Sequence, residues 1–282
     1  MILDDRLAEL TDIDPNTRSA VHALLGGMTD ADRSDAATIR QALLAELGSF
    51  SSTWPEEIPP GSAAAWVSAV LGAVPAVADW MRAAGIPEPT IAATLGDVGR
   101  HLRLEHRNTG RTGFDAPVWM LAVMSGSLYQ LGRLQFDLRR RHPLESVLPA
   151  GFGEWVLDVH IPEAGPLTPE AVAASLRLAV RFFGEHFPDR PVRAAVCASW
   201  LLDPYLGRHL DPSSNMVSFQ RLFTAFGEPR DDQLDAVYFT FGQRSLDGLD
   251  RLPRRSSLQR LVLERLESGQ RWQVVHGYLE LP

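Results

Sequence analysis

The sequence contains no lysine and only one cysteine. All 27 basic residues of the 282-residue chain are arginines, so chemistry that needs a lysine amine, such as a Schiff base or a P-loop phosphate contact, is excluded. Cys197 alone cannot form an internal disulfide or a multi-cysteine metal site. The net charge of −8 is opposite in sign to the surface that nucleic-acid binding requires, and we predict no nucleic-acid partner.

Long apolar runs are also missing. No uninterrupted apolar stretch reaches the roughly 18 residues of a membrane span. The acidic, amphipathic start MILDDRLAEL differs from a signal peptide, which has a basic region followed by an apolar one. We therefore expect a cytoplasmic protein without a membrane partner. His101 and His106 do not have the i,i+4 spacing of a zinc pair, and we predict no metal site.

The periodicity of apolar residues changes once along the chain. Up to about residue 113, apolar residues recur at three- and four-residue spacing, which predicts helices separated by the proline-rich segment 50–61. After residue 113, segments in which polar and apolar residues alternate indicate strands interleaved with helices. Strands are expected at 131–139, 154–161, 192–200, 235–241 and 272–281, and helices at 88–106, 119–129, 169–186, 203–210, 215–226 and 256–266.

This pattern predicts an α+β protein with two domains. A helical N-terminal domain would cover residues 1–113, and a mixed β-sheet flanked by helices would cover residues 114–282. The segment from 154 through the helix at 169–186 to the strand at 192–200 is predicted to be a parallel βαβ unit.

Polar residues share faces on the expected strands. Asp158 and His160 lie on one face of their strand, and Cys197 and Ser199 on one face of theirs. His160 ends its strand just before a turn, where α/β sheets usually bind ligands; a structural role is the alternative for this lone histidine. These four residues are our catalytic candidates, with Cys197 either a nucleophile activated by His160 or an inert buried thiol. Trp119 and the strand residues Arg133 and Gln135 are candidates for substrate contact; a solvent-facing strand is the alternative for the latter two.

The turn PEAGPL at 162–167 leads into the expected helix, with Thr168 as N-cap and Pro169 at its first position. A helix N-terminus presents unpaired N–H groups that suit a phosphate. Gly165 would allow the backbone to approach such an anion closely. An ordinary connection between strand and helix is the alternative.

Four segments together resemble a bacterial, actinobacterial-type acyltransferase family that joins an N-acyltransferase N-terminal helical domain to a GNAT-like C-terminal domain. They are GRLQF at 132–136, HIPEAGPL at 160–167, CASWLLDP at 197–204 and SN at 214–215. The resemblance implies a GNAT fold that holds acyl-CoA as co-substrate between the strands at 154–161 and 192–200. The CoA contacts it implies come from Ile161, Gly165, Leu167, Thr168, Trp200 and Asn215.

The expected function is transfer of an acyl group from acyl-CoA to a small-molecule amine, directly in a ternary complex, with His160 accepting the proton. One alternative is a covalent acyl-enzyme at Cys197. Another is a non-catalytic module that binds acyl-CoA or a protein, which is favoured by PEAGPL standing where the wider superfamily has a glycine-rich signature. The oligomeric state is left open, with a homodimer as one alternative.

Overall fold

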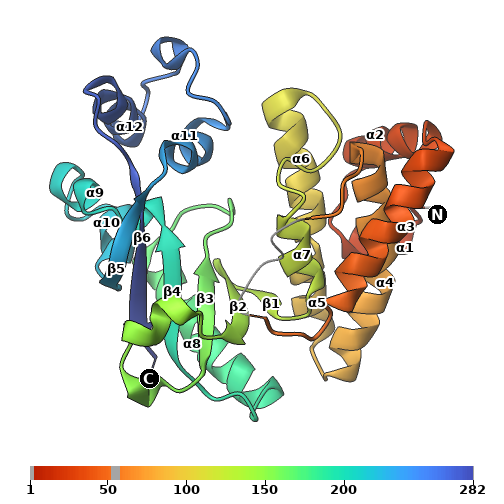
Figure 1. Cartoon of the computed structure of the whole chain (residues 1–282), viewed down its shortest axis with the longest axis horizontal. Coiled ribbons are helices and arrows are strands. Elements are labelled where there is room, and N and C mark those ends of the chain that lie inside the picture. The colour runs from red at the N-terminus through yellow and green to blue at the C-terminus, as the bar shows by residue number, and fades with distance from the viewer. Residues whose placement is uncertain (1–2, 52–57, 282) are drawn as a thin grey trace. The chain divides into compact units, whose positions relative to one another are not determined.

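The computed structural model describes residues 3–51 and 58–281. It divides into two compact units (Figure 1). The first, called the helical unit, comprises Met1–Leu131, Gln135–Arg140 and Glu185–Pro188. The second, called the sheet unit, comprises Gly132–Leu134, Arg141–Gly184 and Asp189–Pro282.

The helical unit is formed mainly by seven α-helices in the part of the chain that the structure describes. They are α1 (Asp5–Leu10), α2 (Pro15–Gly26), α3 (Asp30–Ala45), α4 (Ala63–Ala83), α5 (Glu88–Leu95), α6 (Asp97–Thr109) and α7 (Trp119–Met124). Their starts follow local chemistry: in α3, the Thr29 hydroxyl accepts from the Asp32 N–H while the Asp32 carboxylate accepts from the Thr29 N–H.

Helix α4 is the core of this unit. It is long and apolar enough, by length and composition alone, to cross a membrane, but 67% of its most apolar stretch is buried within the structure. Helices α1, α2, α3, α5 and α7 all pack against it. Its environment is therefore that of a core helix.

The helix expected at 88–106 is in fact two helices, α5 and α6, which meet at Gly96. The start of α6 lies against the end of α1, where the Gly99 N–H donates to the Thr11 carbonyl at 3.0 Å. A Cβ atom at Gly99 would lie only 2.3 Å from the Asp12 carbonyl oxygen. A glycine is thus required where the two backbones approach.

Six strands form a mixed sheet in the order β1-β2-β3-β4-β6-β5. They are β1 (Leu128–Leu131), β2 (Leu134–Arg140), β3 (Trp155–His160), β4 (Val192–Ser199), β5 (Thr224–Asp231) and β6 (Gln273–Glu280). Strands β3 and β4 are parallel and are linked through α8 (Pro169–His186), as the sequence predicted. Strand β6 pairs antiparallel with both β4 and β5 (Figure 1).

The remaining helices of the sheet unit are short. They are α9 (Pro204–His209), α10 (Asn215–Gln220), α11 (Gln233–Phe241), α12 (Ser257–Glu267) and the 3₁₀ turns Pro143–Val147, Ala150–Phe152, Trp200–Leu202 and Leu249–Arg251.

Two expected elements around residue 130 were wrong in extent. The helix expected at 119–129 stops at Met124, and the strand expected at 131–139 is a hairpin formed by β1 and β2. The hairpin turns at Gly132, whose φ of +71° is a conformation that favours glycine. Arg133 therefore lies in the turn and not on a strand face.

Two expectations near the C-terminal end were also wrong. The helix expected at 215–226 ends at Gln220, and β5 begins at Thr224. The strand expected at 235–241 is helix α11, because the Asp232 carboxylate caps the Asp235 N–H at 3.2 Å and Gly242, with φ +73°, ends the helix. The β-branched and aromatic composition of DAVYFTF misled the prediction, since local caps outweigh such propensities.

A buried ion pair lies beneath the last strand of the sheet unit. Asp203, only 1% exposed, accepts from Arg265 Nη1 at 2.6 Å and from the backbone N–H of Gln273 at 3.1 Å. Its second oxygen caps α9 through the Tyr205 N–H at 2.8 Å. The Arg265 guanidinium lies over the Tyr205 and Trp272 rings, 4.1 and 4.5 Å from their centroids.

Candidate functional site

The parallel strands β3 and β4 separate toward their carboxyl ends. Their register pairs Leu157 with Ala195 and Asp158 with Val196, and no further pair forms among the described residues although β3 continues to His160 and β4 to Ser199. Strand β4 remains paired with β6 as far as Ser199. His160 therefore stands where β3 leaves its neighbour, and its Nε2 atom is buried.

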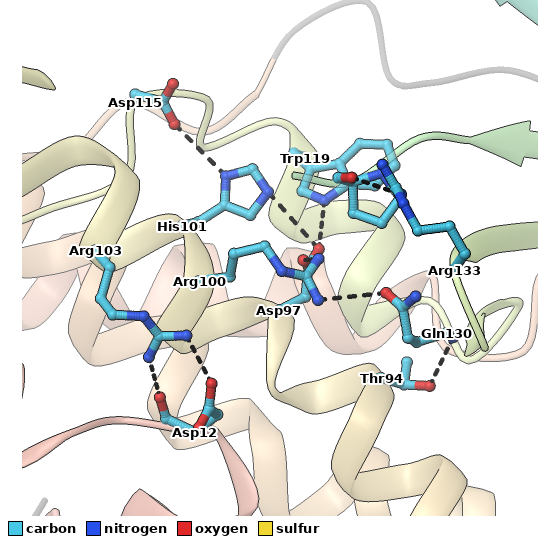
Figure 2. A network of polar contacts seen from close by, with 11 residues as sticks. Asp12, Thr94, Asp97, Arg100, His101, Arg103, Asp115, Trp119, Gln130 and Arg133 are labelled. Carbon is cyan, nitrogen blue, oxygen red and sulfur yellow. Dashed lines mark hydrogen bonds and ion pairs between the residues drawn. The ribbon is translucent and has the colours of Figure 1, made fainter. Parts of the chain in front are cut away.

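The turn after β3 is held by Arg133. The guanidinium donates to the carbonyls of Pro162 at 2.8 Å, Gly165 at 3.1 Å and Pro166 at 3.2 Å. The Arg133 side chain is labelled in Figure 2. The Arg133 backbone N–H in turn donates to Ser175 Oγ, in α8, at 2.7 Å. A residue predicted to contact substrate is thus an internal clamp on the 162–166 turn.

This clamp orients the peptide groups of the turn. In a trans peptide the carbonyl and the following N–H point in opposite directions, and the structure contains no cis peptide bond among its described residues. With the carbonyls of Pro162 and Pro166 directed at the guanidinium, the N–H groups of Glu163 and Leu167 point away from it. Pro166 itself has no N–H. Two backbone donors are consequently fixed on the side opposite the clamp.

Helix α8 begins where the sequence placed it. Thr168 Oγ1 accepts from the Ala171 N–H at 3.3 Å, which confirms its capping role. Gly165 is exposed with a φ of +80°, and a Cβ there would touch nothing within 4 Å. The glycine is therefore needed for the backbone angle and not for a close contact with protein.

Cys197 is unsuited to nucleophilic chemistry. Its side chain is 2% exposed, and burial, together with the charge of Asp158, raises the pKa of the thiol well above its usual range. The reactive thiolate is therefore scarce. Ser199, whose hydroxyl accepts from the Leu201 N–H at 3.1 Å, caps the turn after β4.

We expect the single thiol to be unreactive in the folded protein. Alkylation by iodoacetamide at neutral pH should be at least about tenfold slower than in the urea-unfolded chain, because the thiolate is disfavoured by burial. Mass spectrometry of the intact protein over time measures this rate. Cys197→Ala should retain activity, and a loss of activity without a loss of stability would restore the covalent hypothesis.

The other expected CoA contacts have varied environments. Trp200 is buried against Trp272, with ring centroids 5.5 Å apart, inside the core of the sheet unit. Leu167 is buried, while Ile161 and Asn215, the first residue of α10, are half-buried. Trp200 therefore has a packing role in the structure, whereas the sequence indicated only a contact with CoA.

Trp119 and Gln135 belong to the helical unit. Trp119 Nε1 donates to the buried Asp97 carboxylate at 2.7 Å. Gln135 is 1% exposed, and its Nε2 atom has no hydrogen-bond partner among the described residues. The strand face predicted to be polar and accessible at Gln135 is therefore buried.

A polar network around Asp97 was missed by the sequence analysis (Figure 2). Asp97 also contacts Arg100, whose guanidinium reaches Gln130 Oε1 at 3.3 Å. His101 lies between two carboxylates, with Nε2 3.7 Å from Asp97 Oδ2 and Nδ1 3.6 Å from Asp115 Oδ1. The α6 residues Asp97, Arg100 and His101 are spaced i,i+3 and i,i+4, and this spacing was the sequence signal that could have predicted their contacts. The network joins α6, the following loop, α7 and β1.

No group of three or more histidine, cysteine, aspartate or glutamate side chains is arranged to hold a metal ion among residues 3–51 and 58–281.

Comparison with known proteins identifies both parts of the chain. Residues 1–126 match the model of the N-acyltransferase N-terminal domain, and residues 128–279 match that of the GNAT-like C-terminal domain. No curated protein matches the chain.

Several solved structures resemble the whole chain. They include an acyltransferase in complex with CoA and 10C-teicoplanin at 30% identity, an acyltransferase in complex with decanoyl-CoA and teicoplanin at 31%, and a variant of the acyltransferase orf11* in complex with octanoyl-CoA at 30%. Each has a TM-score of 0.85, and each alignment covers 98% of this chain and 87% of the other.

Proposed function

The chain belongs to the acyltransferase family in which an N-acyltransferase N-terminal domain precedes a GNAT-like C-terminal domain, and on this premise we propose that it moves an acyl group from acyl-CoA to a small-molecule amine. The family and the α+β architecture predicted from the sequence are confirmed. Teicoplanin in the related structures supports glycopeptide amines as the acceptor class.

The separation of β3 from β4 beyond Asp158 and Val196 is the observation that carries the proposal. A parallel pair that opens leaves backbone groups of β3 and β4 without their sheet partner, and an extended thioester-bearing arm can take that place. Directly after β3, the chain forms the turn clamped by Arg133 and then begins helix α8, which has 18 residues. Backbone N–H groups and the helix dipole there suit the pyrophosphate of CoA.

The proposed reaction is a direct transfer. The amine nitrogen attacks the thioester carbonyl carbon, a C–N bond forms, and the C–S bond breaks to release CoA as the leaving thiolate, which a proton then neutralises. His160 accepts the proton that the nitrogen loses. Asp158 precedes it by two residues on the same strand face, and in this proposal its charge stabilises the imidazolium. Holding both substrates together supplies the main rate advantage.

Product formation is the direct test of this function. The chain would be incubated with decanoyl-CoA and teicoplanin as probes. CoA thiol release would be followed with a colorimetric reagent, and the acylated product would be identified by mass spectrometry. Release of thiol that depends on the amine supports direct transfer. Binding of decanoyl-CoA without any product, over a panel of amines, would establish the non-catalytic module instead.

Removing the clamp should weaken binding of acyl-CoA. Arg133→Gln loses the charge and most of the three contacts to the 162–166 turn, so the donors that it orients become disordered. We expect the dissociation constant of CoA to rise by about tenfold or more, equivalent to roughly 1.4 kcal/mol. Titration calorimetry measures it, with the exposed Arg208→Gln as the charge-matched control. Equal affinities for both variants would contradict the role of the clamp.

A further inference from the structure

The helical unit contains a cavity that the proposed acyl transfer does not use. Its volume is about 680 Å³, and residues of α1, α3 and α4 line it. Helices α1 and α3 both pack against α4, so α4 forms the floor between them. A volume of this size is typical of sites for small organic ligands, which usually occupy about 300–1,000 Å³.

Small and apolar residues create this space. Ala36 and Ala37 of α3 face Ala69 and Gly72 of α4 around the cavity, and none of these side chains extends beyond a methyl group. The half-buried Leu7 and Leu10 of α1 complete an apolar wall. This apolar wall of the open pocket can take an aliphatic chain.

Charge at the cavity has the opposite sign to that of the whole protein. Four arginines and two aspartates line it, which is a balance of +2, whereas the chain carries −8. The arginines are Arg6, Arg33, Arg40 and Arg82, and the aspartates are Asp4 and Asp79.

Two of these arginines are already neutralised. Arg82 pairs with Asp79 at 2.8 Å and with Glu88 at 2.5 Å, and Arg33 pairs with Asp30 at 3.3 Å. Arg6 and Arg40 form no ion pair within 4.0 Å with another residue in the described part of the chain, although Arg6 lies near enough to Glu88, the partner of Arg82, to interact with its charge. They are exposed, and they come from different helices, α1 and α3. These two guanidinium groups are the ones at the cavity that an anionic group can contact without displacing an ion pair within 4.0 Å.

We propose that this cavity binds an amphiphile with one anionic head and a short aliphatic chain, namely a medium-chain carboxylate. The carboxylate lies against Arg6 and Arg40, because arginine matches the geometry of a carboxylate. The chain lies over the apolar floor, where burial of its methylene groups away from water is favourable. The residues that line this site all belong to the helical unit, and the proposal does not depend on acyl-CoA binding in the sheet unit.

Binding of decanoate, measured by titration calorimetry below its micellar concentration, tests the proposal. All titrations use the full chain in saturating CoA, so that the site of the sheet unit is occupied. The double variant Arg6→Gln/Arg40→Gln is expected to weaken binding by about tenfold or more. Ala37→Phe, which fills the cavity from an exposed position on α3, should do the same without removing charge. Arg208→Gln is the control and should bind like the unchanged chain.

Two further probes identify the ligand class. Decyltrimethylammonium has the same chain with the opposite charge and should not bind, and inorganic phosphate alone should bind far more weakly than decanoate. Equal affinity for phosphate would overturn the amphiphile assignment, and decanoate binding that neither cavity variant affects would overturn the site. Acyl transfer is measured separately, so its absence in the unchanged chain would refute the proposed function without affecting this result.

Discussion

Replacing His160 with glutamine should lower kcat by about 100-fold or more, which is the usual contribution of a general base, while acyl-CoA binding stays nearly unchanged. Glutamine keeps a polar group of similar length at the end of β3 but cannot accept a proton at neutral pH. His160 is half-buried at the point where β3 and β4 separate. We therefore expect the substitution to slow the chemical step and not to weaken acyl-CoA binding.

The measurement is steady-state kinetics with decanoyl-CoA and a saturating amine, combined with calorimetry of CoA binding. A loss in kcat without a change in CoA affinity indicates a role in proton transfer. His209→Gln, on the exposed face of α9, is the matched control. If His160→Gln keeps full activity, the base lies elsewhere.

The largest effect on stability is expected at Asp203. Asp203→Ala leaves Arg265 buried without its counter-ion, removes the cap of α9 and leaves the Gln273 N–H without its acceptor. Breaking a buried pair from one side typically costs about 3–5 kcal/mol. The free energy of unfolding should fall by about that amount, as measured by urea denaturation followed by circular dichroism.

The double variant Asp203→Ala/Arg265→Met separates charge from packing. It removes the buried cation as well, and its methionine can still pack against Tyr205 and Trp272. We expect it to be more stable than Asp203→Ala alone, because no unpaired charge remains buried. Asp250→Ala, at an exposed position, should leave the unfolding midpoint unchanged. A double variant as unstable as the single one would show that capping, and not the ion pair, dominates.

The segment from β3 to α8 was predicted almost residue by residue. Its signals are local: alternation along 155–160, then Thr168 and Pro169 at positions where helices prefer them. The prediction for 235–241 was wrong because it also relied on local signals. The side chains of this segment favour strands, whereas its helix depends on Asp232 and Gly242 at its ends.

The parts of the candidate site that were not predicted depend on contacts distant in sequence. Arg133 lies 29 to 33 residues from the carbonyls that it binds, and no pattern around it reveals them. The burial of Gln135 and the contact of His101 with Asp115 arise likewise from tertiary packing. Residue types indicated where polar groups gather, whereas only three-dimensional structure showed that Arg133 supports a turn and that Cys197 is inaccessible.

The interior place of β6 in the sheet has a consequence for biosynthesis. Gly277 pairs with Cys197 of β4 on one side and with Ala225 of β5 on the other, so these two strands have no common partner until residues 273–280 have left the ribosome. During translation, β5 and the free edge of β4 are therefore open to pairing with other chains. A chaperone that covers exposed strand edges should therefore raise the fraction of chains with a folded sheet unit more than the fraction with a folded helical unit.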